Sequence, residues 1–309
     1  MKLNYCIYKN KIFFKPVFNV DDYIDIIYKY NELIFSDCNN YNITIKTNNE
    51  YNKNYIRSEF NQLLIIPQNI THITFGYYFN QQVIIPENVT HLTFGCIFNQ
   101  LVTIPSNVIH LTFSDWFNRP LIIPENVTYL AFGNNFNQPI IIPKNIIHLI
   151  FGSKFNQPLI IPENVTHLTF GFLFNQPIII SKNVTHLTLG FFFDQQINLS
   201  NIKYIKLDCN NIDIIENLPN TVEEIEFDYR FNLELQNLPN SIKKIFFNHY
   251  SNYNKELNCL PEFVEYLELN FNYDKKIKKI PLNLKTIKCS EKYKYIDDYK
   301  DVQIKYISK

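Results

Sequence analysis

The sequence predicts a mainly β solenoid of the leucine-rich-repeat type, with one long parallel sheet of about 12 short strands. Two observations support this fold class. The pair Phe-Asn recurs every 19 residues, and each copy carries a segment with apolar residues at relative positions one, four and six. A fixed period of this length is the signature of stacked repeats. A straight parallel β-helix remains the alternative, because 19 residues is just below the usual leucine-rich length.

The repeat is clearest over residues 155–173, which read F-N-Q-P-L-I-I-P-E-N-V-T-H-L-T-F-G-F-L. Alternation across residues 167–170 predicts a short strand with Leu168 and Phe170 facing inward. His167 and Thr169 then face the opposite side of the sheet. The apolar first position recurs at Ile70, Val89, Val108, Val127, Ile146, Val165, Val184, Ile202, Val222, Ile242, Val264 and Leu284.

One repeat cannot fold alone. Burying four or five side chains contributes roughly 10 kcal/mol, whereas ordering each backbone residue costs about 1–2 kcal/mol. Stacking lets neighbouring coils share a core and pair their strands. The asparagine after each repeated Phe is expected to bond the turn backbone of the next coil. The glycine after each strand is expected to allow a bend that a side chain would resist.

The elements are expected in the following order. Residues 1–58 form an N-terminal cap, with a hairpin around Lys9-Asn10, a short helix near 20–29 and a degenerate repeat around Leu33 and Phe35. Regular 19-residue repeats fill 59–200, and looser repeats of 18–22 residues fill 201–290. Residues 291–309 form a C-terminal cap, in which Val302 to Tyr306 supply a last strand. Capping of both ends is what a solenoid requires.

The recurring Phe-Asn-Gln-Pro at 136–139, 155–158 and 174–177 resembles the FNIP repeat family. This family is a relative of leucine-rich repeats found in social amoebae and in giant viruses of amoebae. The resemblance covers residues 60–200 closely and implies a repeat protein that binds partners. Some members carry an F-box or a kinase domain before the repeats, and neither pattern is recognisable here.

Charge and composition limit the classes of molecule that this protein is expected to bind. Basic and acidic residues are equal at 29 each, so no one-signed track for phosphate backbones is present, and nucleic acid is not expected. No apolar run approaches the 18 residues of a membrane span, so no membrane is expected either. Six scattered cysteines without C-x-x-C spacing favour a reducing compartment. The expected location is the cytoplasm, that of the host if the protein is viral, and the expected state is a monomer.

The sequence offers no catalytic residues, cofactor site or metal site, and we expect no enzyme. All six glycines fall at the repeat position after the strand, at 76, 95, 133, 152, 171 and 190. No glycine-rich phosphate loop is therefore possible. G-x-S-x-G and H-E-x-x-H are also missing from the sequence.

A column of histidines is the most distinctive polar feature. Six of the seven occupy one repeat position, on the sheet face opposite the core: His72, His91, His110, His148, His167 and His186. Parallel pairing would set neighbouring rings about 4.8 Å apart. The column can be read as a solvated ladder inherited by duplication, as a weak zinc site, or as a surface that protonation near pH 6 would charge.

The two residues after each glycine vary between copies while their neighbours hardly change. They lie at the strand exit and include Tyr77, Tyr78, Trp116, Phe172, Phe191 and Phe192. Variation on a fixed scaffold is typical of a partner-reading surface, and large aromatics suit interface anchors. The structural alternative is that every second one packs inside.

These patterns predict a scaffold that binds a protein through its concave sheet face and strand-exit rim. One alternative is a substrate-recruiting subunit of a ubiquitin-ligase-type complex, with residues 1–58 docking the machinery. Another is a structural protein without a specific partner. The histidines and the strand-exit aromatics are the candidate partner-binding residues.

Overall fold

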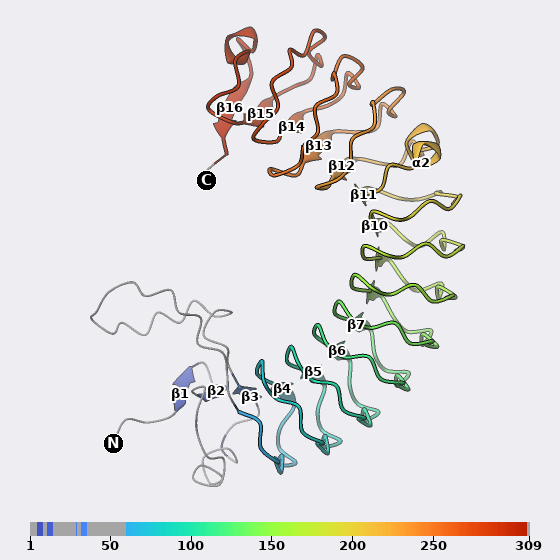
Figure 1. Cartoon of the computed structure of the whole chain (residues 1–309), viewed down its shortest axis with the longest axis vertical. Helices are drawn as coiled ribbons and strands as arrows, with labels where there is room; N and C mark the ends of the chain where they lie inside the picture. The colour runs from blue at the N-terminus through green and yellow to red at the C-terminus, as the bar shows by residue number, and fades with distance from the viewer. Residues whose placement is uncertain (1–4, 9–10, 15–28, 30–31, 36–59, 308–309) are drawn as a thin grey trace, which may run out of the picture. The chain divides into compact units, whose positions relative to one another are not determined.

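The computed structural model describes residues 5–8, 11–14, 29, 32–35 and 60–307. The chain divides into two compact units, Met1–Gly152 and Ser153–Lys309, which are described separately. In both units the strands follow one another in chain order, with each coil contributing one short strand (Figure 1).

The described residues of the first unit form eight strands. They are β1 (Tyr5–Tyr8), β2 (Lys11–Phe14), β3 (Glu32–Phe35), β4 (His72–Thr74), β5 (His91–Thr93), β6 (His110–Thr112), β7 (Tyr129–Ala131) and β8 (His148–Ile150). β1 and β2 form an antiparallel hairpin, and every later strand of this unit pairs in parallel with the strand before it. The hairpin predicted around Lys9-Asn10 is confirmed.

The second unit also contains eight strands, together with two helical turns. They are β9 (His167–Thr169), β10 (His186–Leu189), β11 (Tyr204–Leu207), α2 (Ile212–Glu216), β12 (Glu224–Phe227), β13 (Lys244–Phe247), β14 (Tyr266–Glu268), β15 (Thr286–Cys289), the 3-10 helix η2 (Ile296–Asp298) and β16 (Gln303–Tyr306). All strand pairs here are parallel. The predicted last strand is confirmed as β16.

The predicted fold class is therefore confirmed as a mainly β, leucine-rich-repeat-like solenoid. One strand per coil matches that class rather than a parallel β-helix. The degenerate repeat is also confirmed, because Leu33 and Phe35 of β3 are buried. The helix predicted near 20–29 lies outside the described residues. The segment boundaries at 58, 200 and 290 stay predictions.

The core consists of stacked phenylalanines. In most regular coils the inward Phe that follows the strand packs on the Phe of the Phe-Asn pair, as Phe94 does on Phe98 with ring centroids 4.1 Å apart. Phe94 also stacks on Phe113 of the next coil at 5.0 Å. All of these rings are buried. Each stacked pair adds about 0.5–1.5 kcal/mol beyond the burial of its area, so every coil is stabilised chiefly by its neighbours.

Asparagine side chains bond one coil to the next, as the sequence predicts. The backbone N–H of Asn99 donates to Oδ1 of Asn80 at 2.9 Å, and the N–H of Asn118 donates to Oδ1 of Asn99 at 3.0 Å. The same bond recurs at Asn80, Asn137, Asn175 and Asp194. These bonds satisfy turn backbone that has no partner in the sheet.

The glycine column has a different physical reason from the predicted bend. None of the described glycines has a positive φ. A Cβ at Gly95 would instead collide with the backbone carbonyl of Gly76 in the coil before it. Glycine is therefore needed at Gly95 because successive coils approach each other closely at the strand exit. Ser114 is the one residue with a side chain at this position of the regular coils.

Candidate partner-binding surface

The six histidines lie where the parity of the strands predicts. Each is the first residue of its strand, with the core-facing Leu or Ile beside it buried and the histidine itself half-buried. Tyr129 fills the gap in β7. The histidines therefore face the side of the sheet opposite the core, together with the residue two positions later, which is threonine after every histidine except His148.

The rings do not have one uniform spacing. Ring centroids are 4.1 Å apart for His72 and His91 but 5.6 Å for His91 and His110. His110 then lies 4.0 Å from Tyr129. In the second unit, His167 and His186 are 4.1 Å apart. The side chains thus lean together in pairs, and the single spacing of about 4.8 Å expected from strand pairing is wrong for the rings.

Threonines orient most of these imidazoles. The hydroxyl of Thr71 lies 2.9 Å from Nδ1 of His72, and the hydroxyl of Thr90 lies 3.0 Å from Nδ1 of His91. His167 and His186 have the same contact with Thr166 and Thr185. A hydroxyl can donate to or accept from Nδ1, so the contact sets the orientation of the ring but does not determine which ring nitrogen carries the proton.

The environment favours neutral imidazoles. Burial lowers the pKa of His91, and the neighbouring His72 lowers it further. Burial and the imidazoles on either side also lower the pKa of His110. Within the described ranges, no three His, Cys, Asp or Glu side chains gather in a way that could hold a metal ion. The lowered pKa values of His91 and His110 favour the neutral form of these two imidazoles at pH 7.

The strand-exit residues of the first unit are all at least partly exposed. Trp116 is 59% exposed and Tyr78 is 39% exposed, while Tyr77 is half-buried and packs edge-on against Tyr78 with centroids 4.8 Å apart. The structural alternative, in which every second residue of these pairs packs inside, is wrong, since none of the pairs from 77–78 to 191–192 has a buried member. The strand exits form a continuous rim in each unit.

In the second unit the rim contains an aromatic rim cluster, which we define as Phe172, Phe191, Phe192 and Arg230. Phe172 stacks on Phe191 at 5.5 Å, and Phe192 meets both rings edge-on at 5.0 and 5.1 Å. The Arg230 guanidinium carbon lies 4.6 Å from the centroid of Phe172 and 5.3 Å from that of Phe191. Phe192 is 48% exposed.

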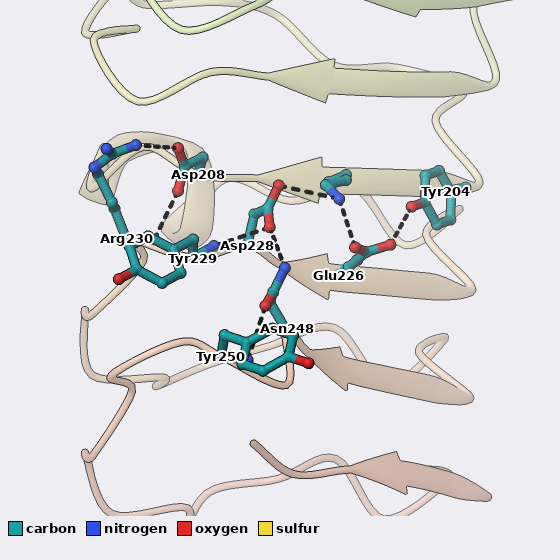
Figure 2. Close-up of polar contacts among 9 residues, drawn as sticks. Tyr204, Asp208, Glu226, Asp228, Tyr229, Arg230, Asn248 and Tyr250 are labelled. Atoms are coloured by element: carbon teal, nitrogen blue, oxygen red, sulfur yellow. Dashed lines mark hydrogen bonds and ion pairs between the residues drawn. The ribbon is translucent and has the colours of Figure 1, made fainter. Parts of the chain in front are cut away.

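Asp208 holds Arg230 in place. It accepts a hydrogen bond from the Arg230 backbone N–H at 2.7 Å, and its other oxygen lies 3.7 Å from Nη1 (Figure 2). Sequence reasoning missed Arg230 because it belongs to the looser repeats, where the strand-exit column is no longer obvious. The only sequence signal for Arg230 is that it directly follows Asp228-Tyr229 at the exit of β12.

Next to this cluster, a polar network covers the sheet face of β11 to β13 (Figure 2). Glu226 accepts from the Tyr204 hydroxyl and the Lys206 ammonium, both at 2.6 Å. Lys206 also lies 3.0 Å from Asp228, which accepts from Asn248 Nδ2 at 2.7 Å. Burial and the Glu226 carboxylate raise the pKa of Tyr204. Although burial acts to lower it, these two carboxylates raise the pKa of Lys206.

A third surface was also missed by sequence reasoning. Several coils have an isoleucine that points into solvent in the middle of the Leu-Ile-Ile-Pro segment or of a close variant of it, on the part of the coil that returns to the next strand. We call these residues the return ridge: Ile84, Ile122, Ile141, Ile160 and Ile179, each 88–90% exposed. A groove of about 810 Å³ lies between Ile160 and Ile179. The alternation of exposed and buried isoleucines in this extended segment was the available signal.

Comparisons with known proteins agree with this architecture. The solved structure described as "The crystal structure of CroV588 a novel circular LRR protein structure", from the giant virus CroV, is 29% identical and superposes with a TM-score of 0.69. The match takes in 94% of this chain and 48% of CroV588, so the chain spans about half of that protein's length. No curated protein matches. No helix among the described residues is long and apolar enough to cross a membrane.

The family model described as FNIP Repeat matches in seven overlapping or separate segments. They are 60–97, 82–116, 98–135, 117–154, 136–173, 155–181 and 209–250. The last of these lies in the part with looser spacing. Because these segments cover more than half of the sequence and coincide with the stacked coils, the chain belongs to the FNIP repeat family.

Proposed function

We propose that this chain is a non-catalytic scaffold that binds a protein partner through its sheet face and strand-exit rim. The observation that carries the proposal is the aromatic rim cluster. Its three phenylalanines lie at positions where nearly identical coils differ, and Phe192 is 48% exposed. Leu173, which is 37% exposed, extends the apolar surface beside it.

Protein partners suit this chemistry best. Aromatic residues and arginine are enriched in the buried centres of protein interfaces. Arg230 is already held by Asp208 and by two phenyl faces, so it loses little side-chain freedom when a partner binds. The sheet face of the regular coils carries His and Thr side chains, which offer hydrogen bonds, and it has no row of Lys or Arg to attract phosphate backbones.

We further propose a cytoplasmic location, that of the host if the protein is viral. Cys96, Cys209, Cys259 and Cys289 are free thiols, which supports a reducing compartment. The alternative role in a ubiquitin-ligase-type complex depends on residues 1–58. Most of these residues lie outside the described part of the chain, and we do not propose this role.

The test is affinity capture with the tagged full chain from native or infected cells. Two rim variants, Phe192→Ser and Leu173→Ser, remove exposed apolar surface without touching the core. Ile179→Ser is the matched control, because it removes an exposed apolar side chain from the return ridge of the same unit. We expect a protein captured by wild type and by Ile179→Ser, and a loss of about tenfold, equivalent to about 1.4 kcal/mol, with the rim variants.

The proposal fails if no protein is enriched over an unrelated solenoid bait. It also fails if the enriched protein is lost with Ile179→Ser and kept with both rim variants, which would move the interface to the return ridge. Circular dichroism of all variants checks that the coils remain folded.

A further inference from the structure

The sheet face of the second unit carries a cleft that the proposed function does not use. It has a volume of about 330 Å³ and lies over β12, β13 and β14. Its principal lining residues are Glu226, Phe246, His249, Tyr250 and Glu268, and we call it the Phe246 cleft.

Strand register places an aromatic ring between two carboxylates. Phe246 of β13 pairs with Glu226 of β12 on one side and with Glu268 of β14 on the other. All three side chains therefore share one face of the sheet. With strands about 4.8 Å apart, the backbones that carry the two glutamates lie about 10 Å apart, on either side of the strand that carries Phe246. Tyr250, which is 69% exposed, stands at the edge of the cleft.

Both carboxylates are fixed in position. Glu268, only 8% exposed, accepts from the Tyr266 hydroxyl at 2.7 Å, from Lys288 at 3.0 Å and from His249. Although burial acts to raise it, these hydrogen bonds hold the pKa of Glu268 below its usual value. Glu226 is held in the same way by Tyr204 and Lys206. Both carboxylates are therefore held in fixed positions and do not have to rearrange when a ligand binds.

The lysines bind these carboxylates from the outer sides. In register, Lys206 lies on β11 beyond Glu226, and Lys288 lies on β15 beyond Glu268. Phe246 is the uncharged centre of this row of five. The lysines are therefore separated from Phe246 by the glutamates, and the charged side chains next to it in register are both anionic. The Tyr266 ring packs beside the Phe246 ring, with centroids 5.2 Å apart.

The chemistry that fits this arrangement is a flat cation. A guanidinium stacks on an aromatic face, is weakly hydrated, and has five N–H donors that can reach carboxylates beside the ring. An ammonium is a compact, strongly hydrated charge and gains less from the flat ring. An anionic ligand would meet two carboxylates.

We propose that the Phe246 cleft receives the guanidinium of an arginine side chain on the protein partner. The inference rests on the proposed function, because it supplies the chemistry of the partner that the scaffold would bind. It adds a second contact on the sheet face, distinct from the aromatic rim cluster.

The probe is the peptide acetyl-Gly-Arg-Gly-amide, titrated against the full chain and observed by saturation-transfer NMR. We expect saturable binding. The peptide with citrulline in place of arginine, which has the same shape without the charge, should bind about tenfold more weakly. Phe246→Leu should cause a similar loss. Glu224→Gln is the matched control, because Glu224 lies on the same strand as Glu226 but pairs with Lys244 at 2.7 Å outside the cleft. The Glu224→Gln variant should bind the arginine peptide as well as wild type does.

Three results would overturn the inference. The arginine and citrulline peptides could bind equally. The same peptide with lysine in place of arginine could bind as well as the arginine peptide. Phe246→Leu could bind the arginine peptide like wild type. Phe246→Tyr keeps a ring in the cleft and should bind the probe. If Phe246→Leu does not fold, the inference is tested by Phe246→Tyr, and loss of binding in a folded Phe246→Tyr would contradict it. The probe needs no partner, so its failure would leave the capture experiment on the rim unaffected, and the reverse also holds.

Discussion

Arg230 lies over the ring of Phe172, with its guanidinium carbon 4.6 Å from the ring centroid, although the two residues belong to coils that are not adjacent in sequence. Phe172 follows β9, whereas Arg230 follows β12. The intervening strand exits of Phe191 and Asp208 also contact this arginine. The contact therefore spans four consecutive coils and links the regular repeats to the looser ones.

Removing this contact should weaken the second unit. A partly exposed cation–π contact contributes about 0.5–1 kcal/mol. We expect Arg230→Ala to lower the free energy of unfolding by about 1 kcal/mol, measured by urea denaturation. Arg119→Ala is the control, because Arg119 is exposed and donates only to a backbone carbonyl, that of Asn99, at 2.9 Å. Equal effects of the two changes would mean that the aromatic stacking of Arg230 contributes nothing.

The glycine column gives a sharper prediction. Gly95→Ala places a methyl group against the backbone of Gly76 in the preceding coil, and that backbone cannot yield without separating the two coils. We expect a loss of roughly 3 kcal/mol or more, in the range of overpacked and strained sites. Ser114→Ala at the same repeat position is the control. It removes only the bond from the Ser114 hydroxyl to the Phe94 carbonyl, at 2.8 Å, and should cost about 1 kcal/mol. Thermal and urea unfolding measure both variants.

Two buried tyrosines should respond in opposite ways to loss of the hydroxyl. Tyr273 donates to the carbonyl of Lys255 at 3.2 Å, whereas the Tyr253 hydroxyl is buried and has no hydrogen-bond partner in the described part of the chain. Burial raises the pKa of both phenols. Tyr253→Phe should leave stability unchanged or raise it by about 1 kcal/mol, and Tyr273→Phe should lower it by about 1 kcal/mol. If Tyr253→Phe is less stable than wild type, the Tyr253 hydroxyl forms a hydrogen bond in the folded chain.

Stability should fall on acidification. The pKa values of His91 and His110 are lowered in the folded chain, so below pH 6.5 the unfolded chain binds more protons than the folded one. Stability therefore rises with pH across this window and is fully present above the unfolded pKa. The double variant His91→Gln, His110→Gln should have a shallower dependence of its urea midpoint between pH 5 and 7. An unchanged slope would exclude these two imidazoles as its cause.

The periodic features of the fold were predictable from sequence because each depends on a fixed position in the coil. The Asn80-to-Asn99 bond and the inward packing of Leu168 and Phe170 require only that successive coils superpose in register. The same argument placed His72 and His91 on the opposite face of the sheet.

Features that break or subdivide the period were not predictable. The pairwise leaning of the histidine rings depends on side-chain rotamers, which strand spacing does not determine. Arg230 reaches Phe172 only because a side chain from a looser coil extends back across its neighbours. The short helix α2 replaces an extended return in a single coil. The Phe246 cleft likewise exists in one place, where a Phe replaces the polar residue of its column.

The central claim is that the partner binds the strand-exit side of the coils. Hydrogen–deuterium exchange of the full chain, with and without the captured partner, tests it most directly. We predict that binding slows exchange in peptides covering 170–175, 189–194 and 228–232, and leaves 158–162 and 177–181 on the return ridge unchanged. Slower exchange confined to the return-ridge peptides would contradict the claim.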